Sequence, residues 1–211
     1  MIKSKKDLFE YISADKKAMG RPKEGRIIVW VKKIFKWEKI LIEDYLITLR
    51  KVEYLHNIQK GPFQYIRYGM LFYKYRRQCI KLLINIPPNV AGAGLTIYHL
   101  GPITINKLVR MGSNCTLQPG VVIGQNRTGE NVPVIGDNVY FCPGAKVFGK
   151  VKVGNNVVIA PNSVVIKDVP DNCVVSGVPA VIIKMGGVKE QHAHKKRKAY
   201  LVVNAESIIE S

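Results

Sequence analysis

His99 is the residue of this chain whose type and position are best suited to acid–base chemistry. The sequence has four histidines, and His99 is the only one between residues 57 and 191. An imidazole titrates near neutral pH, so histidine is the usual base for taking a proton from a hydroxyl group. A single histidine is about as often a structural residue, exposed or packed, as a catalytic one. The elements around His99 must therefore decide its role.

The cysteines offer less chemistry than their number suggests. There is no C-x-x-C pair, and apolar or small residues flank all four positions, Cys79, Cys115, Cys142 and Cys173. This pattern favours reduced thiols in a cytoplasmic protein. We expect Cys115 in the core and favour a packing role for Cys142. His192 and His194 lie in a basic tail, where a solvated segment is favoured over a metal site, so no metal is expected.

The chain is strongly basic, and the charge is unevenly distributed. Over 211 residues there are 33 Lys and Arg against 15 Asp and Glu, a formal net charge of +18. Residues 1–84 carry +12 of it, residues 85–184 carry +4 and residues 185–211 carry +2. Residues 1–84 are therefore expected to contact an anionic membrane or an anionic glycan. Nucleic acid is not expected, because no aromatic–basic recognition motif is present.

The distribution of apolar residues indicates where the protein is located. No apolar run approaches the roughly 20 residues that span a bilayer. Residues 1–6 are polar and no apolar segment follows them, which argues against a secretory signal. We therefore predict a cytoplasmic location and leave open a peripheral position at the inner membrane face.

Residues 1–84 are predicted to form a basic α-helical domain. Apolar residues recur at helical spacing in Asp7–Lys17, Glu38–His56 and Phe63–Ile84, with Gly- and Pro-containing breaks between them. The stretch Ile27–Trp37 is apolar with interleaved lysines. It is expected to pack as a helix, and a position on a membrane surface is the alternative.

A six-residue repeat dominates residues 85–184. Apolar or small residues recur at a step of six in two series: Ile135, Phe141, Val147, Val153, Ile159, Val165, and Val139, Ala145, Val151, Val157, Ser163, Val169. The step continues upstream at Ile97, Ile103, Val109, Cys115 and Val121. Neither an α-helix nor an alternating strand has this period, whereas a parallel β-helix does. Three hexapeptides would complete one coil, with inward anchors stacking 18 residues apart.

The register breaks once, because Val121 and Ile135 are 14 residues apart where 12 would keep the phase. The intervening Gln125–Pro133 is polar and contains glycine, so we predict an extruded loop with a functional role. Residues 185–211 are predicted to be a basic C-terminal tail.

Three segments of the repeat resemble a known enzyme family. Gly94-Leu-Thr-Ile-Tyr-His-Leu-Gly-Pro-Ile-Thr-Ile105 is similar to the catalytic-histidine segment of serine O-acetyltransferases. Ile135–Gly149 and Ser176-Gly-Val-Pro-Ala180 resemble their acetyl-CoA-binding half. Residues 84–184 thus resemble the left-handed β-helix acyltransferases, in the branch that also includes acetyltransferases of capsular and other surface sugars. The resemblance implies acetyl-CoA as co-substrate and a homotrimer with active sites between neighbouring subunits.

The resemblance also implies roles for individual residues. His99 would be the general base of a direct transfer, with no covalent enzyme intermediate. The backbone N–H groups of Gly144 and Ala145 would stabilise the oxyanion. Small residues along the pantetheine arm and lysines near the phosphates would bind CoA: Ala160, Pro161, Ser163, Lys167, Gly177, Pro179, Ala180 and Lys184. A β-helix carbonic anhydrase needs three zinc-binding histidines, and the repeat has only His99.

Departures from the family pattern bear on the acceptor. Tyr98 stands where an aspartate precedes the catalytic histidine, and Asn85 stands where the family has a second aspartate. Asn131 and Val132 replace an arginine–histidine pair, and Arg127 lies nearby but out of register. A zwitterionic acceptor needs fixed counter-charges, whereas Asn85, Tyr98 and Asn131 are neutral.

These departures lead us to predict an O-acetyltransferase acting on a sugar of a surface or capsular polysaccharide, or on its precursor. Tyr98, Arg127 and Asn131 would contact the acceptor, and Asn85 or a backbone carbonyl would orient His99. The alternatives are a serine O-acetyltransferase of cysteine biosynthesis and a non-enzymatic β-helix scaffold.

Overall fold

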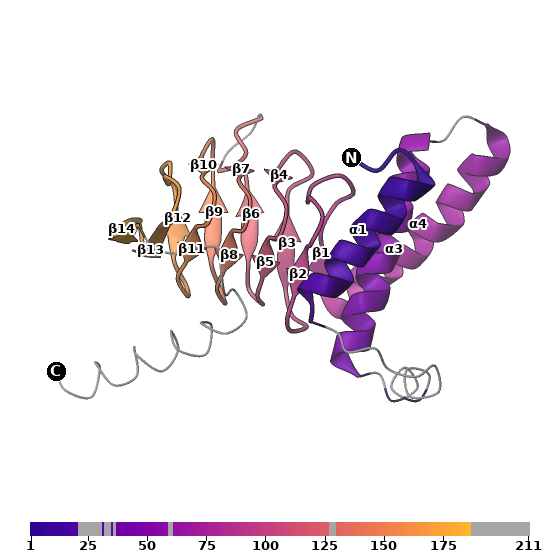
Figure 1. Cartoon of the computed structure of the whole chain (residues 1–211), viewed down its shortest axis with the longest axis horizontal. Helices are drawn as coiled ribbons and strands as arrows, with labels where there is room; N and C mark the ends of the chain where they lie inside the picture. The colour runs from indigo at the N-terminus through magenta and orange to yellow at the C-terminus, as the bar shows by residue number, and fades with distance from the viewer. Residues whose placement is uncertain (21–30, 32–34, 36, 59–60, 127–129, 187–211) are drawn as a thin grey trace.

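The computed structural model consists of a helical bundle joined end-on to a long β-helix (Figure 1). It describes residues 1–20, 31, 35, 37–58, 61–126 and 130–186. The helices lie at one end of the long axis, and successive β-coils extend from them to the other end (Figure 1). This arrangement confirms the predicted fold class of a β-helix that follows N-terminal helices.

The helical part contains α1 (Lys5–Ala18), α3 (Glu38–Ile58) and α4 (Pro62–Leu82). Helix α1 begins with a capping box, because the Asp7 N–H donates to Ser4 Oγ at 3.0 Å and the Ser4 N–H donates to Asp7 Oδ2 at 3.0 Å. Pro62 opens α4, where a missing N–H costs nothing. All three helices match the segments predicted from apolar spacing to within a few residues.

Short parallel strands form the β-helix, and they fall into three sheets that make the three faces of the coil. One sheet contains β1 (Ile84–Asn85), β3 (Ile103–Ile105), β6 (Val122–Gly124), β9 (Lys146–Phe148) and β12 (Val164–Val165). The second contains β4 (Arg110–Met111), β7 (Val134–Ile135) and β10 (Lys152–Val153). The third contains β2 (Thr96–Ile97), β5 (Thr116–Leu117), β8 (Tyr140–Phe141), β11 (Val158–Ile159), β13 (Cys173–Gly177) and the antiparallel β14 (Ala180–Met185).

The anchors predicted from the six-residue step fill the interior of this prism. Every one of them, from Ile97 to Val169, has 6% or less of its surface exposed. Asparagines at the corners, such as Asn138 and Asn156, adopt the left-handed conformation that a tight turn requires. The period of six therefore reflects one strand and one turn per hexapeptide.

The stacking of the coils corrects the predicted phase of the upstream anchors. The sequence series aligned Ile97 with Cys115, but the backbone pairs Ile97 with Leu117, and Leu117 with Phe141. Each hexapeptide has two inward positions two residues apart, and both Cys115 and Leu117 are buried. A series read at every sixth residue can therefore switch from one inward position to the other and still meet an apolar residue at each step. The two-residue shift lies between Ile97 and Ile105, in the first coil.

The loop predicted at Gln125–Pro133 leaves the phase intact. Val122 pairs with Lys146, 24 residues further on, whereas Tyr140 pairs with Val158 at the regular spacing of 18. The loop therefore inserts one whole hexapeptide. Gln125, Asn126, Glu130 and Asn131 are exposed, whereas Val132 is half-buried and Pro133 is buried.

A buried arginine joins the helices to the β-helix. Arg50 of α3 has no exposed surface and forms ion pairs with Asp15 of α1 and with Glu53. Its guanidinium also donates to the backbone carbonyls of Ala91 and Gly92 in the first coil. The orientation of α3 relative to the first strands is fixed by these contacts.

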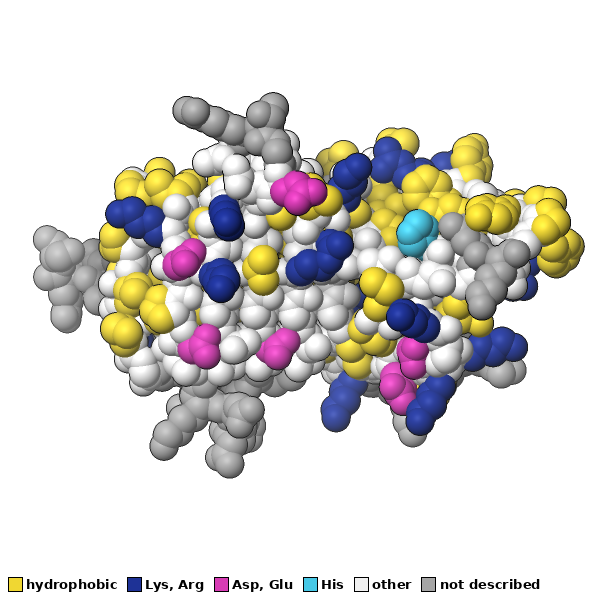
Figure 2. Space-filling view, turned by 90° about the horizontal axis from the view of Figure 1, so that it is seen from above, with side chains coloured by type: hydrophobic (Ala, Val, Ile, Leu, Met, Phe, Trp, Pro, Cys, Tyr) yellow, Lys and Arg dark blue, Asp and Glu magenta, His cyan; other side chains and the backbone are white. Residues whose placement is uncertain are grey.

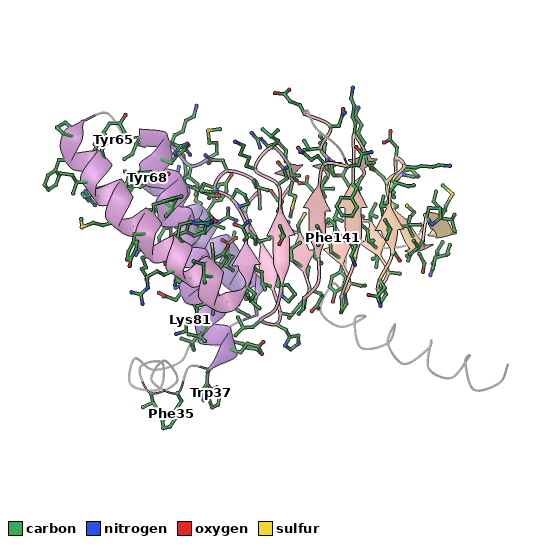
Figure 3. The ribbon with its side chains drawn as sticks, turned by 180° about the vertical axis from the view of Figure 1, so that it is seen from behind. Phe35, Trp37, Tyr65, Tyr68, Lys81 and Phe141 are labelled. Atoms are coloured by element: carbon green, nitrogen blue, oxygen red, sulfur yellow. The ribbon has the colours of Figure 1, made fainter. Side chains whose placement is uncertain are left out.

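None of the described helices is both long enough and apolar enough to cross a membrane. The stretch Ile27–Trp37 lies outside the described residues except for Val31, Phe35 and Trp37, which are exposed. Figure 3 shows Phe35 and Trp37 pointing away from the helical bundle.

Candidate active site

His99 lies at the corner that directly follows β2, with 65% of its side chain exposed. Its Nδ1 is 3.3 Å from Oε2 of Glu38, the first residue of α3. The other oxygen of Glu38, Oε1, accepts the backbone N–H of Leu100 at 2.6 Å. An exposed imidazole with Nδ1 held by a carboxylate can present Nε2 to a substrate as a general base.

Sequence reasoning missed Glu38. It is 61 residues from His99 in the chain and belongs to a different predicted domain. An acid at the first position of a helix is common, because the helix dipole favours negative charge there. That signal marks a helix start and does not indicate a catalytic partner, so only the docking of α3 could place Glu38 beside His99.

One edge of the β-helix carries several of the other predicted site residues. Residues that follow β2, β5, β8 and β11 line up there, because these strands are consecutive neighbours in one sheet. With strands about 4.8 Å apart, Cys142 lies about 10 Å along this edge from the level of His99, and Ala160 about 14 Å. The edge therefore runs from the level of His99 toward the last coils.

The predicted oxyanion donors are already engaged within the coil. The N–H of Gly144 donates to the Pro119 carbonyl at 2.8 Å, and the N–H of Ala145 donates to the Cys142 carbonyl at 3.1 Å. Either group would have to exchange that bond to stabilise an oxyanion. The oxyanion role of Gly144 and Ala145 stays a prediction, and these internal hydrogen bonds argue against it.

The predicted CoA-binding residues separate into buried and exposed groups. Ser163 has no exposed surface, and its hydroxyl accepts the N–H of Gly177 at 3.1 Å, so it supports the fold of the hairpin β13–β14. Ala160 is half-buried, and its N–H donates to the Val175 carbonyl at 2.9 Å. The residues left on the surface of the last coils are Pro161, Lys167, Gly177, Pro179 and Lys184, together with the half-buried Ala180.

The described residues predicted to contact the acceptor or orient His99 lie in separate segments of the β-helix. Asn85 lies on β1, which pairs with β3, whereas His99 lies at the corner between β2 and β3. The side chain found beside Nδ1 of His99 is Glu38 rather than Asn85. The prediction that Asn85 or a backbone carbonyl orients His99 therefore has a competitor in Glu38. Tyr98 is half-buried next to His99, and Asn131 is exposed in the inserted loop. Arg127 lies outside the described residues.

The cysteine thiols are unsuited to nucleophilic chemistry. Burial raises the pKa of Cys142 to about 11 and that of Cys115 to about 12. Both side chains are therefore neutral thiols at physiological pH. Within the described part of the chain, no group of three or more His, Cys, Asp or Glu residues is placed to hold a metal ion.

Comparison with protein families and curated proteins matches the repeat region. The family model described as bacterial transferase hexapeptide (six repeats) matches residues 133–167. A serine acetyltransferase of Staphylococcus aureus is 40% identical over 109 residues, which cover 50% of this chain and 51% of that protein. The chain thus spans about half the length of the curated relatives it matches.

Comparison with solved structures extends the likeness to most of the chain. The crystal structure of serine acetyltransferase from Brucella abortus is 25% identical with a TM-score of 0.67, covering 88% of this chain and 72% of that one. The same enzyme in complex with coenzyme A gives the same identity and TM-score. The helical bundle and the β-helix therefore have counterparts in one known arrangement.

Proposed function

We propose that this chain, whose β-helix belongs to the hexapeptide-repeat transferase superfamily, is an acetyl-CoA-dependent O-acetyltransferase with L-serine as acceptor. The observation that carries the proposal is the exposed imidazole of His99 on a β-helix that is similar to serine acetyltransferases. CoA is bound by a structural neighbour of the same fold, which supports acetyl-CoA as the co-substrate here.

The sugar acceptor predicted from the sequence is contradicted by these comparisons. The curated relatives at 40% and 36% identity and the solved neighbours are serine acetyltransferases. The prediction rested on the neutral residues Asn85, Tyr98 and Asn131 at positions where the family pattern has charged ones. Counter-charges for an amino acid can come from other residues of a folded site, so their absence at three positions is weak grounds for a different acceptor.

The reaction requires one proton to move twice. His99 takes the proton of the serine hydroxyl as the hydroxyl oxygen attacks the thioester carbonyl of acetyl-CoA. The C–O bond forms, the C–S bond breaks, and the protonated imidazole returns the proton to the departing CoA thiolate. The products are O-acetylserine and CoA.

The test is CoA release from acetyl-CoA with L-serine, for the wild-type protein beside His99→Ala. Removing a general base lowers the rate by about 10²- to 10⁴-fold. His56→Ala is the matched control, because His56 is an exposed histidine of α3 that contacts Tyr68. Wild-type turnover that survives in His99→Ala would refute the base, and absence of serine turnover in the wild type would refute the acceptor.

Assembly as a homotrimer with active sites between subunits stays a prediction. Large apolar side chains that remain exposed on the β-helix support it, among them Val134 at 51%, Ile166 at 52% and Ile183 at 62%. Sedimentation of the intact chain measures the assembly state directly.

Peripheral contact with an anionic membrane also stays a prediction, and α4 provides a face for it. Exposed apolar residues follow one stripe of the helix: Phe63, Ile66, Met70, Tyr73 and Ile80. The helix also carries five Lys and Arg and no Asp or Glu. Figure 2 shows exposed hydrophobic side chains with Lys and Arg among them at the end of the molecule that holds the helices. Two copies of α4 would repel each other, whereas an anionic surface complements both features.

A further inference from the structure

We infer that Glu38 is a positioning residue for His99, and that it fixes which imidazole nitrogen carries the proton. The inference rests on the proposed function, since it assigns a second residue to the same site. It places a side chain of the helical domain in the active centre, which otherwise consists of β-helix residues.

The two oxygens of Glu38 have separate partners, and together these define the geometry. Oε1 accepts the Leu100 N–H at 2.6 Å, and Leu100 directly follows His99 in the chain. The carboxylate is therefore tied to the backbone that carries the imidazole. Oε2 then faces Nδ1 of His99 at 3.3 Å. Within the described residues, Glu38 is the one carboxylate that lies within 4 Å of this ring.

The chemistry of the pair follows from which groups can donate. An ionised carboxylate is an acceptor only, so Nδ1 must carry the hydrogen in the contact with Oε2. A neutral imidazole has one N–H, and Nε2 is then left with a free lone pair. This is the tautomer that a general base needs if Nε2 faces the substrate hydroxyl.

The position of Glu38 is held by more than its own hydrogen bonds. Arg50 lies on the same helix, about 18 Å further along the axis. Its guanidinium donates to the carbonyls of Ala91 and Gly92 in the first coil. Helix α3 therefore contacts the first coil at two separated points, and rigid docking keeps the carboxylate beside the imidazole.

Glu38→Gln separates positioning from packing. The Leu100 N–H still needs an acceptor, which directs the amide oxygen of the new side chain toward Leu100 and its NH₂ group toward His99. The NH₂ group then donates to Nδ1, which moves the ring hydrogen to Nε2 and removes the base. The equivalent carboxylate-to-amide change in a buried catalytic triad lowers kcat by about 10⁴. Glu38 is 41% exposed, so water can partly replace it, and we expect a loss in kcat of roughly 100-fold.

The kinetic test compares three variants of the full chain in the serine assay. Glu38→Gln should lower kcat with KM changed by less than about 3-fold, and Glu38→Asp should recover part of the loss. Asp44→Asn is the matched control, because Asp44 is a carboxylate of the same helix that contacts Lys74 and Gln78. It should retain the wild-type kcat. Equal kcat for Glu38→Gln and wild type would overturn the inference.

A second measurement tests the inference without any acceptor. The ¹⁵N chemical shifts of the ring nitrogens report the tautomer of His99, assigned by comparison with His99→Ala and recorded at about pH 8.5, where an ordinary imidazole is neutral. We expect the hydrogen on Nδ1 in the wild type and on Nε2 in Glu38→Gln, with His56 unchanged. A wild-type His99 with its hydrogen on Nε2 would overturn the inference. If the wild type fails to acetylate serine while the tautomers behave as expected, the proposed acceptor is wrong and the pairing stands.

Discussion

Replacing Arg50 by methionine should strongly destabilise this protein while leaving the β-helix repeat untouched. The guanidinium lies 2.8 Å from Asp15 Oδ2 and 3.0 Å from Glu53 Oε2, and it donates to the carbonyls of Ala91 at 2.9 Å and Gly92 at 2.6 Å. Methionine has nearly the same length, so it fills most of the space but replaces none of these bonds. Two buried carboxylates lose their cation.

The size of the effect follows from that loss. Removing one partner of a buried ion pair costs about 3–5 kcal/mol, mostly through the charge left unpaired. For 211 residues, an unfolding entropy of about 2.1 cal/mol/K per residue converts this cost into a fall in Tm of about 7–11 °C. Circular dichroism melting at a fixed protein concentration measures it. Arg77→Met on the exposed surface of α4 is the matched control and should shift Tm by less than about 2 °C.

The pH dependence distinguishes lost charge pairing from lost packing. Burial raises the pKa of Glu53, and Arg50 acts in the opposite direction. Without Arg50 the folded-state pKa of Glu53 rises further above its unfolded value. A carboxyl group whose pKa is higher in the folded than in the unfolded protein stabilises the fold at pH values below its unfolded-state pKa. That contribution is lost as the pH rises through its folded-state pKa. The loss of folding stability caused by Arg50→Met should therefore be smaller at pH 5 than at pH 7. A deficit under about 1 kcal/mol at pH 7, or one independent of pH, would refute this account of the joint.

Three further outcomes follow from the structure. Phe141→Ala should lower the free energy of unfolding, measured in urea, by about 3–5 kcal/mol, because Phe141 is fully buried in the β-helix core. A loss under about 1 kcal/mol would contradict the stacked interior. Cys142 should react slowly with iodoacetamide at pH 7, since its pKa is raised to about 11, and Cys142→Ala should keep kcat within about 3-fold; rapid alkylation would argue against burial of the thiol. The double change Ile66→Glu and Tyr73→Glu should abolish sedimentation with vesicles containing anionic phosphatidylserine while preserving CoA release; wild-type protein that does not bind such vesicles would remove the membrane prediction.

The sequence alone was sufficient for the β-helix, because its determinant is local. One inward residue and one turn recur every six positions, and every anchor so predicted is buried. The same pattern could not resolve which of two inward positions, Cys115 or Leu117, lies in line with Ile97. Both are apolar and both are buried, so only the pairing of neighbouring strands distinguishes them.

The acceptor shows a different limit of sequence reasoning. Neutral residues at Asn85, Tyr98 and Asn131 suggested a sugar, but the substitution pattern at three positions carried less information than the similarity of the whole repeat to serine acetyltransferases. The carboxylate found beside His99 is that of Glu38 rather than a contact from Asn85, which spacing along the chain could not reveal.

What the sequence determined by itself was the repeat and the three helices, since each is encoded in contiguous residues or in a fixed period. The catalytic role of His99 stays a prediction. What only the tertiary structure decided was how the two parts meet. Glu38 reaches His99 across 61 residues, and Asp15 reaches the Leu95 N–H across 80. Contacts of this kind depend on how α1 and α3 dock against the first coil, and no local pattern of residues encodes that geometry.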